Sequence, residues 1–332
     1  MEHVEGIRNG AGAKTNGVPE VGARCSSLYG VRIASDWVLP FDTPAADAGA
    51  PDVVIHREIP AHYRDEVARV MEREPPRDAS NIQRRLGDAL YVCWQGLFDF
   101  VVTDSGRDIF SRPLQAEAGE SFHTYLFNQV LSFALLRRGR EPLHSSSVVV
   151  GGRAIAFLGD CGYGKSSLAA ACISAGHRLL TDDLLVTEET EAGWIAHPGP
   201  SRMKLYPEMA DHFFGPGAPR VPMNADTPKA ILSIPPESMV TSAVPLAALV
   251  VLRPPAGDEA GVELARISPR EAFVAFTTNT FNDLARGPDG LRHHLEWASR
   301  LASGVPAWRL SYPRDRGVFP EVVERVARLA AD

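Results

Sequence analysis

The stretch AIAFLGDCGYGKSSLAAACISAGHRLLTDDLLV, residues 154–186, decides the fold of this chain. It opens with an apolar strand over 154–158 and continues with the octet GDCGYGKS, residues 159–166. The octet has the form G-x-x-x-x-G-K-[ST], in which glycines let successive backbone N–H groups turn toward a polyphosphate without a Cβ in the way. A helix over 165–175 is expected next, with its positive end directed at the same anion. The stretch therefore predicts a strand, a phosphate-binding loop (P-loop) and a helix of an α/β fold.

The loop residues have expected roles in binding ATP and Mg²⁺. Lys165 is expected to contact the outer phosphates and to be catalytic, and the Ser166 hydroxyl is expected to bind Mg²⁺. The chain has only four lysines, so a lysine at this position by chance is improbable. The alternative is a glycine-rich turn whose lysine faces solvent. The predicted nucleotide-binding residues are Gly159, Asp160, Cys161, Gly162, Tyr163, Gly164, Lys165, Ser166 and Ser167.

Two adjacent aspartates, Asp182 and Asp183, follow a second apolar strand over 178–181. Mg²⁺ beside phosphates prefers one or two carboxylates, and a kinase also needs a carboxylate directed at the acceptor hydroxyl. Two neighbouring carboxylates at one strand end can divide these tasks. The alternative is that they only terminate the strand, which would leave both tasks without a residue.

The pair Gly151–Gly152 predicts a hairpin between strands over 146–150 and 153–158. The strand that carries His144 would then run beside the strand that leads into the loop. This arrangement places His144 near the phosphates. From the residues alone, the alternative is a structural histidine at a strand end.

The segments LHSSSVVVGG, GDCGYGKSS and AGHRLLTDD together resemble the catalytic core of the HPr kinase/phosphorylase family and of the wider group of HPr-kinase-like serine kinases. The resemblance covers about residues 143–186 and implies a P-loop catalytic domain with a central mixed sheet. It implies that Asp183 takes the proton from the acceptor hydroxyl, that His144 assists, and that Asp182 lies near the metal. Some members modify ribosomally made peptides such as lasso peptides, and relatives assemble as homo-oligomers. A peptide or small-protein substrate and a homo-oligomer are therefore expected.

Length and composition argue against several classes of function. The chain has 332 residues, of which 45% are hydrophobic, enough for two domains with a sizeable core. The formal charge of −7 argues against nucleic acid and anionic membranes as partners. No apolar run is long enough to span a bilayer, no amino-terminal apolar signal is recognisable, and the four cysteines have no metal-ligand or disulfide spacing. A soluble, cytoplasmic protein is expected, where ATP is available.

The expected organisation is a disordered leader over 1–24, a smaller α+β domain over 25–140 and the catalytic domain over 141–332. The leader is rich in Gly and Ala and has almost no large apolar residues. The middle region carries no chemical motif. Its pattern predicts strands over 29–38 and 52–59, a helix over 63–71, a meander between 89 and 111, and a helix over 121–138.

Charged residues after the aspartates are weaker candidates. In the predicted strand over 202–205, Arg202 and Lys204 alternate with apolar residues, so both share one side, where they contact phosphate or face solvent. Glu208 is a further candidate metal ligand. The segment over 213–227 contains several Gly and Pro and is expected to be a mobile loop and a lid.

The carboxy-terminal third is predicted to be structural. A buried strand is expected over 246–253, and Ser268 with Glu271 forms a capping box that starts a helix. Two further helices and an intervening strand follow. The pair His293–His294 lacks the spacing of a zinc site and is expected at the surface.

These features favour one function and leave two alternatives. The favoured function is transfer of the γ-phosphoryl group of ATP to a hydroxyl, in particular a serine, of a peptide or small protein. The alternatives are a kinase of small-molecule hydroxyls and a nucleotide-gated regulator that hydrolyses or only binds ATP. Intact Asp183 and His144 favour transfer over binding alone.

Overall fold

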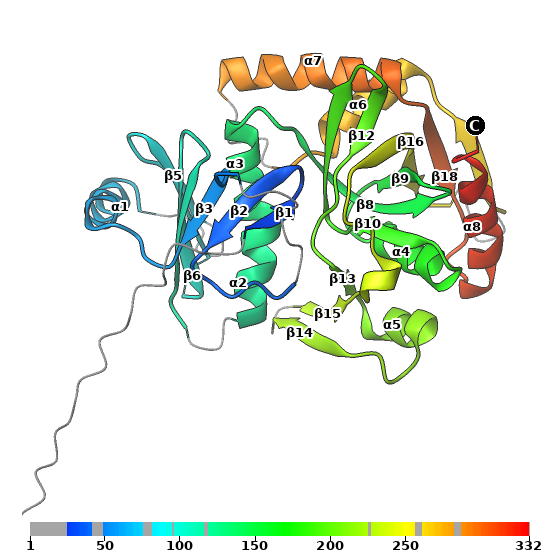
Figure 1. The fold of residues 1–332 in the computed structure, drawn as a ribbon, viewed down its shortest axis with the longest axis horizontal. Coiled ribbons are helices and arrows are strands. Elements are labelled where there is room, and N and C mark those ends of the chain that lie inside the picture. Colours follow the sequence, from blue (N-terminus) through cyan, green and yellow to red (C-terminus); the bar gives the residue numbers. More distant parts are fainter. Residues whose placement is uncertain are drawn as a thin grey trace, which may run out of the picture.

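A computed structural model describes residues 25–41, 49–75, 82–94, 96–115, 119–224, 227–255, 261–281 and 287–331. Within these residues the chain is a mixed α/β protein with sheets of seven, eight and three strands (Figure 1). The predicted leader over 1–24 lies outside the described residues.

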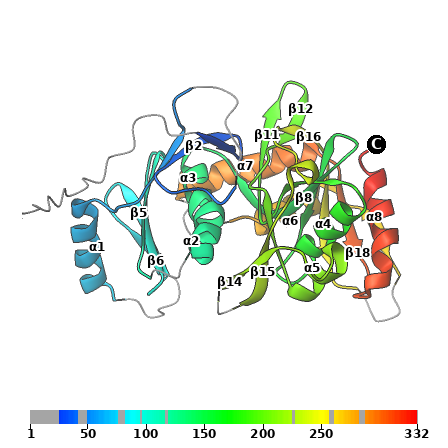
Figure 2. The same cartoon turned by 60° about the horizontal axis from the view of Figure 1, so that its bottom comes forward.

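The first sheet is formed by the amino-terminal part of the chain, in the order β1-β2-β3-β7-β6-β5-β4. Side chains alternate between its two faces. In β5, for example, Val92 packs against the helices over 119–137 that follow the sheet, whereas Tyr91 packs in a core with Tyr63 of α1. Figure 2 shows α1 on one side of this sheet and α2 on the other. Its elements are β1 (Ser26–Leu28), β2 (Val31–Ser35), β3 (Val53–His56), α1 (Ala61–Arg73), β4 (Ile82–Arg85), β5 (Ala89–Trp94), β6 (Phe98–Thr103) and β7 (Asp108–Pro113).

Two predictions for this region need correction. The strand predicted over 29–38 is a hairpin, because Tyr29 and Gly30 have φ of 55° and 75° and turn the chain between β1 and β2. The helix predicted over 121–138 is interrupted by a π-helical turn. It consists of α2 (Gly119–Tyr125), the π turn η1 (Leu126–Val130) and α3 (Leu131–Arg137), called here the helical segment.

The eight-stranded sheet carries the stretch that decides the fold. Its order is β10-β8-β11-β12-β16-β18-β17, and β9 pairs antiparallel with β8 and parallel with β16. The hairpin at Gly151–Gly152 is confirmed, with φ of 57° and 85° at the two glycines. The strands are β8 (Pro142–Val150), β9 (Arg153–Leu158), β10 (Arg178–Thr181), β11 (Leu184–Thr190), β12 (Gly193–Ala196), β16 (Val244–Arg253), β17 (Glu263–Arg266) and β18 (Ala307–Ser311).

Helices cover both faces of this sheet, as the central parallel strands require. Phe157 of β9 packs in a core with α4 (Lys165–Ser174) and α8 (Phe319–Arg328). The neighbouring Leu158 packs in another core with α6 (Pro269–Thr278) and α7 (Pro288–Gly304). The predicted capping box of α6 is confirmed, since Ser268 and Glu271 bond reciprocally.

The loop predicted over 213–227 is not one continuous loop in the described residues of that segment, whereas residues 225–226 lie outside the described residues. The segment contains the end of α5 (Pro207–Phe214) and the strand β14 (Arg220–Asn224). That strand pairs antiparallel with β15 (Thr227–Ser233), which in turn pairs with β13 (Arg202–Leu205) to complete the third sheet. Gly215, with φ of 84°, ends α5, and Pro222 is tolerated because β14 is an edge strand. The Gly and Pro content therefore marks a helix end and a sheet edge.

The surface prediction for His294 is also wrong. Its side chain is buried and its Nδ1 lies 3.0 Å from Glu141 Oε2. His294 belongs to the buried stripe of α7 with Trp297, Ala298 and Leu301, which the helical spacing places on one face. Separately, no helix among the described residues has the length and apolarity needed to cross a membrane.

Candidate functional site

The loop between β9 and α4 has the backbone that its glycines permit. Gly159, Gly162 and Gly164 have φ of 140°, 85° and 92°, a region in which other residues are strained. A Cβ on Gly164 would lie 3.1 Å from the Tyr312 hydroxyl, so space as well as conformation favours glycine there. The loop is fixed at its first residue, because the Gly159 N–H donates to Asn279 Oδ1 at 2.8 Å. The helix predicted after the loop is confirmed as α4.

The Lys165 ammonium lies within the loop. Its Nζ donates to the carbonyl oxygen of Gly159 at 2.6 Å and to that of Asp160 at 3.2 Å. Burial lowers the pKa of Lys165, and the charges of Asp183 and Asp182 oppose that shift. The lysine is therefore not the solvent-facing residue of the alternative interpretation.

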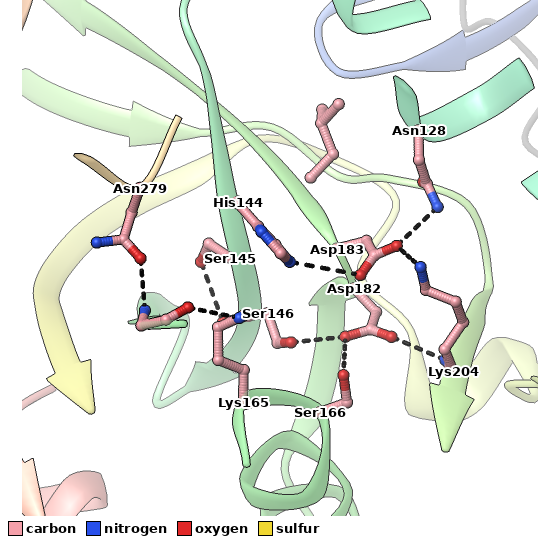
Figure 3. Close-up of polar contacts among 12 residues, drawn as sticks. Asn128, His144, Ser145, Ser146, Lys165, Ser166, Asp182, Asp183, Lys204 and Asn279 are labelled. Carbon is pink, nitrogen blue, oxygen red and sulfur yellow. Dashed lines mark hydrogen bonds and ion pairs between the residues drawn. The ribbon is translucent and has the colours of Figure 1, made fainter. Parts of the chain in front are cut away.

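Asp182 is joined to the loop by a hydroxyl. Its Oδ1 accepts hydrogen bonds from Ser166 Oγ at 2.9 Å and from Ser146 Oγ at 2.6 Å, and its Oδ2 accepts from the Lys204 backbone N–H at 2.8 Å (Figure 3). The side chain is buried. Burial and the charge of Asp183 raise the pKa of Asp182 above its usual range. The structure thus brings together the two residues predicted to bind metal.

Asp183 is held differently. Its backbone has φ of 76°, which is rare for a residue other than glycine. Its Oδ2 accepts a hydrogen bond from Asn128 Nδ2 at 2.9 Å and forms an ion pair with Lys204 Nζ. Its Oδ1 lies 3.9 Å from His144 Nε2. Burial alone would raise the pKa of Asp183, but the charge of Lys204 outweighs it, so the pKa lies below the usual range.

His144 lies on β8, where it pairs with Leu184 across the strands. Its ring packs against Phe281 with 5.1 Å between centroids, and its backbone N–H donates to the Asn279 carbonyl at 2.8 Å. Burial lowers the pKa of His144 to about 4, a shift that the charge of Asp183 only partly opposes. The imidazole is therefore neutral at neutral pH.

Of these groups, His144, Lys165, Ser166 and Asp183 line one pocket of about 390 Å³, whereas Asp182 does not line it. Three of the four lysines of the chain, Lys165, Lys204 and Lys229, line it. Its other lining residues include the aromatic and cationic side chains of residues 312–319. They are His144, Cys161, Gly162, Tyr163, Gly164, Ser166, Ser167, Asp183, Leu205, Tyr206, Glu208, Met209, Tyr312, Pro313, Arg314, Asp315, Arg316 and Phe319. Gly159 and Asp160 of the predicted set do not line the pocket, and their carbonyl groups bind Lys165 instead.

The weaker candidates have mixed outcomes. The solvent-exposed alternative for Arg202 and Lys204 is wrong, because Arg202 is buried in an ion pair with Glu120 and Lys204 pairs with Asp183. Glu208 is exposed and lines the pocket.

Sequence reasoning missed Asn128, Ser146 and Asn279 as site residues. Their partners lie 55, 36 and 120 residues away in the sequence. Asn128 and Asn279 belong to no recognisable motif, whereas Ser146 lies within the segment LHSSSVVVGG that carries the family resemblance. Lys229 is a further pocket residue outside the predicted set, and the rarity of lysine in this chain is the signal that could have indicated it.

Comparison with known proteins gives a distant structural relationship. We found no family model that matches the chain, and no curated protein matches it. Solved structures that match include the Hpr(Ser) kinase/phosphatase from Coxiella burnetii, at 13% identity and a TM-score of 0.32. The match covers 57% of this chain and 96% of that one.

Proposed function

We propose that this chain is an ATP-dependent kinase that transfers the γ-phosphoryl group to a serine hydroxyl of a peptide or small protein. The observation that carries the proposal is the division of two adjacent carboxylates. Asp182 is bonded to Ser166 of the loop, whereas Asp183 is near His144 and lines the same pocket. A phosphoryl-transfer site needs both a metal-side carboxylate and a carboxylate for the acceptor proton.

The pocket suits a nucleoside triphosphate. Its volume of about 390 Å³ lies within the usual range of small-molecule sites, about 300–1,000 Å³. The loop backbone and Lys165 favour phosphate at one end, and Lys229 adds a cation that shifts the pKa values of His144 and Asp183. Tyr206, Tyr312 and other apolar residues offer surface for a base.

The residues also fit Mg²⁺. Ser166 Oγ and Asp182 Oδ1 lie 2.9 Å apart, and metal–oxygen bonds of 2.0–2.1 Å at right angles separate two ligands by about 2.9 Å. Among the described residues no cluster of three His, Cys, Asp or Glu could hold a metal by itself. Mg²⁺ at phosphoryl-transfer sites uses few protein ligands and takes the rest from phosphates and water. A buried carboxylate with a raised pKa is also stabilised by a cation. When bound, Mg²⁺ would neutralise charge on the phosphates.

The residues of the chain account for the remaining chemistry. Asp183 Oδ1 accepts the proton of the acceptor hydroxyl while the acceptor oxygen bonds to the γ-phosphorus and the bond from phosphorus to the ADP oxygen breaks. His144 is neutral, so it orients the acceptor by hydrogen bonding and adds no charge. Lys165 and the loop N–H groups hold the phosphates in line. The choice of a peptide serine is supported by the motif resemblance over residues 143–186.

The test is phosphoryl transfer from γ-labelled ATP with Mg²⁺ to two sets of acceptors, a library of serine-containing peptides and a panel of small hydroxyl compounds. We expect labelled peptide, identified by mass spectrometry, and no labelling with Lys165→Ala. Labelling of small compounds alone would favour a small-molecule kinase. Tight Mg-ATP binding without transfer to any hydroxyl would refute a kinase and favour the nucleotide-gated regulator.

A further inference from the structure

One of the donors to Asp183 comes from the amino-terminal part of the chain. Asn128 lies in the π turn η1 of the helical segment, and its Nδ2 lies 2.9 Å from Asp183 Oδ2. Figure 3 shows the amide approaching the carboxylate from the side opposite His144. The amide nitrogen faces Asp183, because the amide oxygen and a carboxylate are both acceptors and would repel each other.

The π turn explains how a buried helix presents this one polar side chain. A π turn departs from regular α-helical geometry, and such turns are frequent at functional sites. Leu126, Phe127 and Val130 of the same turn are buried in the core beneath the first sheet. The turn therefore keeps its apolar residues in the core while Asn128 reaches the site.

Further contacts fix the helical segment against the third sheet. Glu120 forms an ion pair with Arg202 of β13, and Arg202 Nη2 also donates to Thr124 Oγ1 at 3.2 Å. Ser121 Oγ donates to the Met223 carbonyl of β14 at 2.9 Å. Because β13 also carries Lys204, both donors to Asp183 Oδ2 come from elements that contact each other directly.

The two carboxylate oxygens of Asp183 therefore have different partners. Oδ2 receives both the Asn128 amide and the Lys204 ammonium, whereas Oδ1 is directed toward His144 at 3.9 Å. We propose that Asn128 is a positioning residue that, together with Lys204, occupies Oδ2 and so directs Oδ1 of Asp183 at the acceptor hydroxyl. This inference rests on the proposed kinase function. It makes the amino-terminal part of the chain a contributor to the active site.

Two substitutions separate positioning from packing. Asn128→Ala removes the donor and the volume, whereas Asn128→Asp keeps the volume and replaces the donor with a carboxylate. We expect kcat to fall about 10- to 100-fold in Asn128→Ala, because loss of orientation at the reacting group has effects of this size. The kcat of Asn128→Asp should fall at least as far. The KM for ATP should stay at the wild-type value in both, and the Tm should stay at the wild-type value in Asn128→Ala but fall in Asn128→Asp, where two carboxylates repel each other.

The measurements use the full-length protein with Mg-ATP. Steady-state phosphate release gives kcat and KM with water as acceptor, and the serine-peptide library serves as a second acceptor. Calorimetry gives the Mg-ATP affinity, and thermal unfolding gives Tm. The matched control is Arg138→Ala, which removes an ion pair to Asp52 just after α3, away from the pocket, and should keep wild-type kcat.

The outcomes separate this inference from the proposed function. Wild-type kcat within twofold in either Asn128 variant overturns the positioning role. Recovery of activity in the isosteric Asn128→Asp, with joint loss of kcat and Tm in Asn128→Ala, also overturns it, because only volume would then matter. If the wild-type protein binds Mg-ATP but transfers to neither water nor peptide, the kinase proposal fails and the inference fails with it.

Discussion

At the scale of single residues, two adjacent carboxylates differ because their surroundings differ. Burial and the charge of Asp183 raise the pKa of Asp182 although its hydrogen-bond donors oppose the shift, whereas the charge of Lys204 outweighs burial and lowers the pKa of Asp183. Side chains that follow one another in a strand point to opposite faces. Asp182 and Asp183 lie in the turn between β10 and β11, and the φ of 76° at Asp183 allows both carboxylates to lie at one end of the loop. Pairs of acids with divergent pKa values are typical of sites that divide two tasks.

The two aspartates should therefore separate in kinetics. Asp183→Asn removes basicity but keeps size, so phosphoryl transfer should fall by about 10²–10⁴, the usual contribution of a positioned base. Its Mg-ATP affinity should stay level or rise, because a negative charge leaves the neighbourhood of the phosphates. Asp182→Asn should mainly raise the Mg²⁺ concentration needed. Calorimetry with Mg-ATP and transfer rates against free Mg²⁺ measure both. Wild-type transfer in Asp183→Asn, with none in Asp182→Asn at any Mg²⁺ concentration, would mean that the roles are reversed.

His144 should make stability depend on pH. Burial lowers its pKa to about 4, whereas an unfolded histidine titrates near 6.5. Between these values the unfolded chain binds more protons, so the stabilisation from the neutral ring is complete above pH 6.5 and is lost as pH falls toward 4. His144→Gln removes this titration. Urea unfolding at pH 7 and pH 5 should show a smaller loss of stability for the variant, and equal losses in both proteins would contradict the burial argument.

At the scale of elements, the sequence predicted helices, strands and turns correctly where they depend on residues that are neighbours in the chain. The strand, loop and helix over 153–174, the Gly151–Gly152 hairpin and the capping box of α6 depend on neighbouring residues, and all were predicted. The π turn and β14 were missed. The π turn is set by how the helical segment packs, and β14 exists because it pairs with β15. For the same reason the loop, aspartates and His144 were identified as candidates from the sequence, whereas Asn128 and Asn279 required the fold.

The end of α6 should control the loop. Asn279 is the C-cap of α6, and its side chain accepts the Gly159 N–H. Asn279→Ala leaves this N–H without its partner, at a cost of about 1–3 kcal/mol. With half of that cost falling on the loop, Mg-ATP binding should weaken about 2- to 10-fold. Ser268→Ala at the other end of the same helix is the control. It should lower stability by about 1 kcal/mol and leave Mg-ATP affinity unchanged. Calorimetry and urea unfolding on both variants measure this, and equal ATP affinities would show that α6 does not fix the loop.

At the scale of the whole molecule, the first sheet and the eight-stranded sheet contribute residues to one hydrophobic core. Leu184 and Val186 of β11 pack in the same core as the helical segment and the first sheet. The ion pair between Glu120 and Arg202 joins the helical segment to the third sheet, with 19% and 10% of the two side chains exposed. Burial lowers the pKa of Arg202 to about 10, yet at neutral pH it remains charged and needs its partner. We therefore expect the two sheets to unfold together.

The Glu120–Arg202 pair offers the test of that coupling. Glu120→Gln leaves a buried guanidinium without its counter-charge and should cost about 3–5 kcal/mol. The double variant Glu120→Gln with Arg202→Met removes the charge as well and should recover part of that loss, because a buried ion pair is often replaceable by apolar groups.

Urea unfolding followed by tryptophan fluorescence and by far-ultraviolet circular dichroism should give one coincident transition in the wild type. Trp94 lies in the core of the first sheet and Trp297 in that of the second, so the fluorescence reports on both. Separate transitions would show that the first sheet and the eight-stranded sheet unfold independently. A single variant as stable as the double would show that this ion pair does not couple the helical segment to the third sheet.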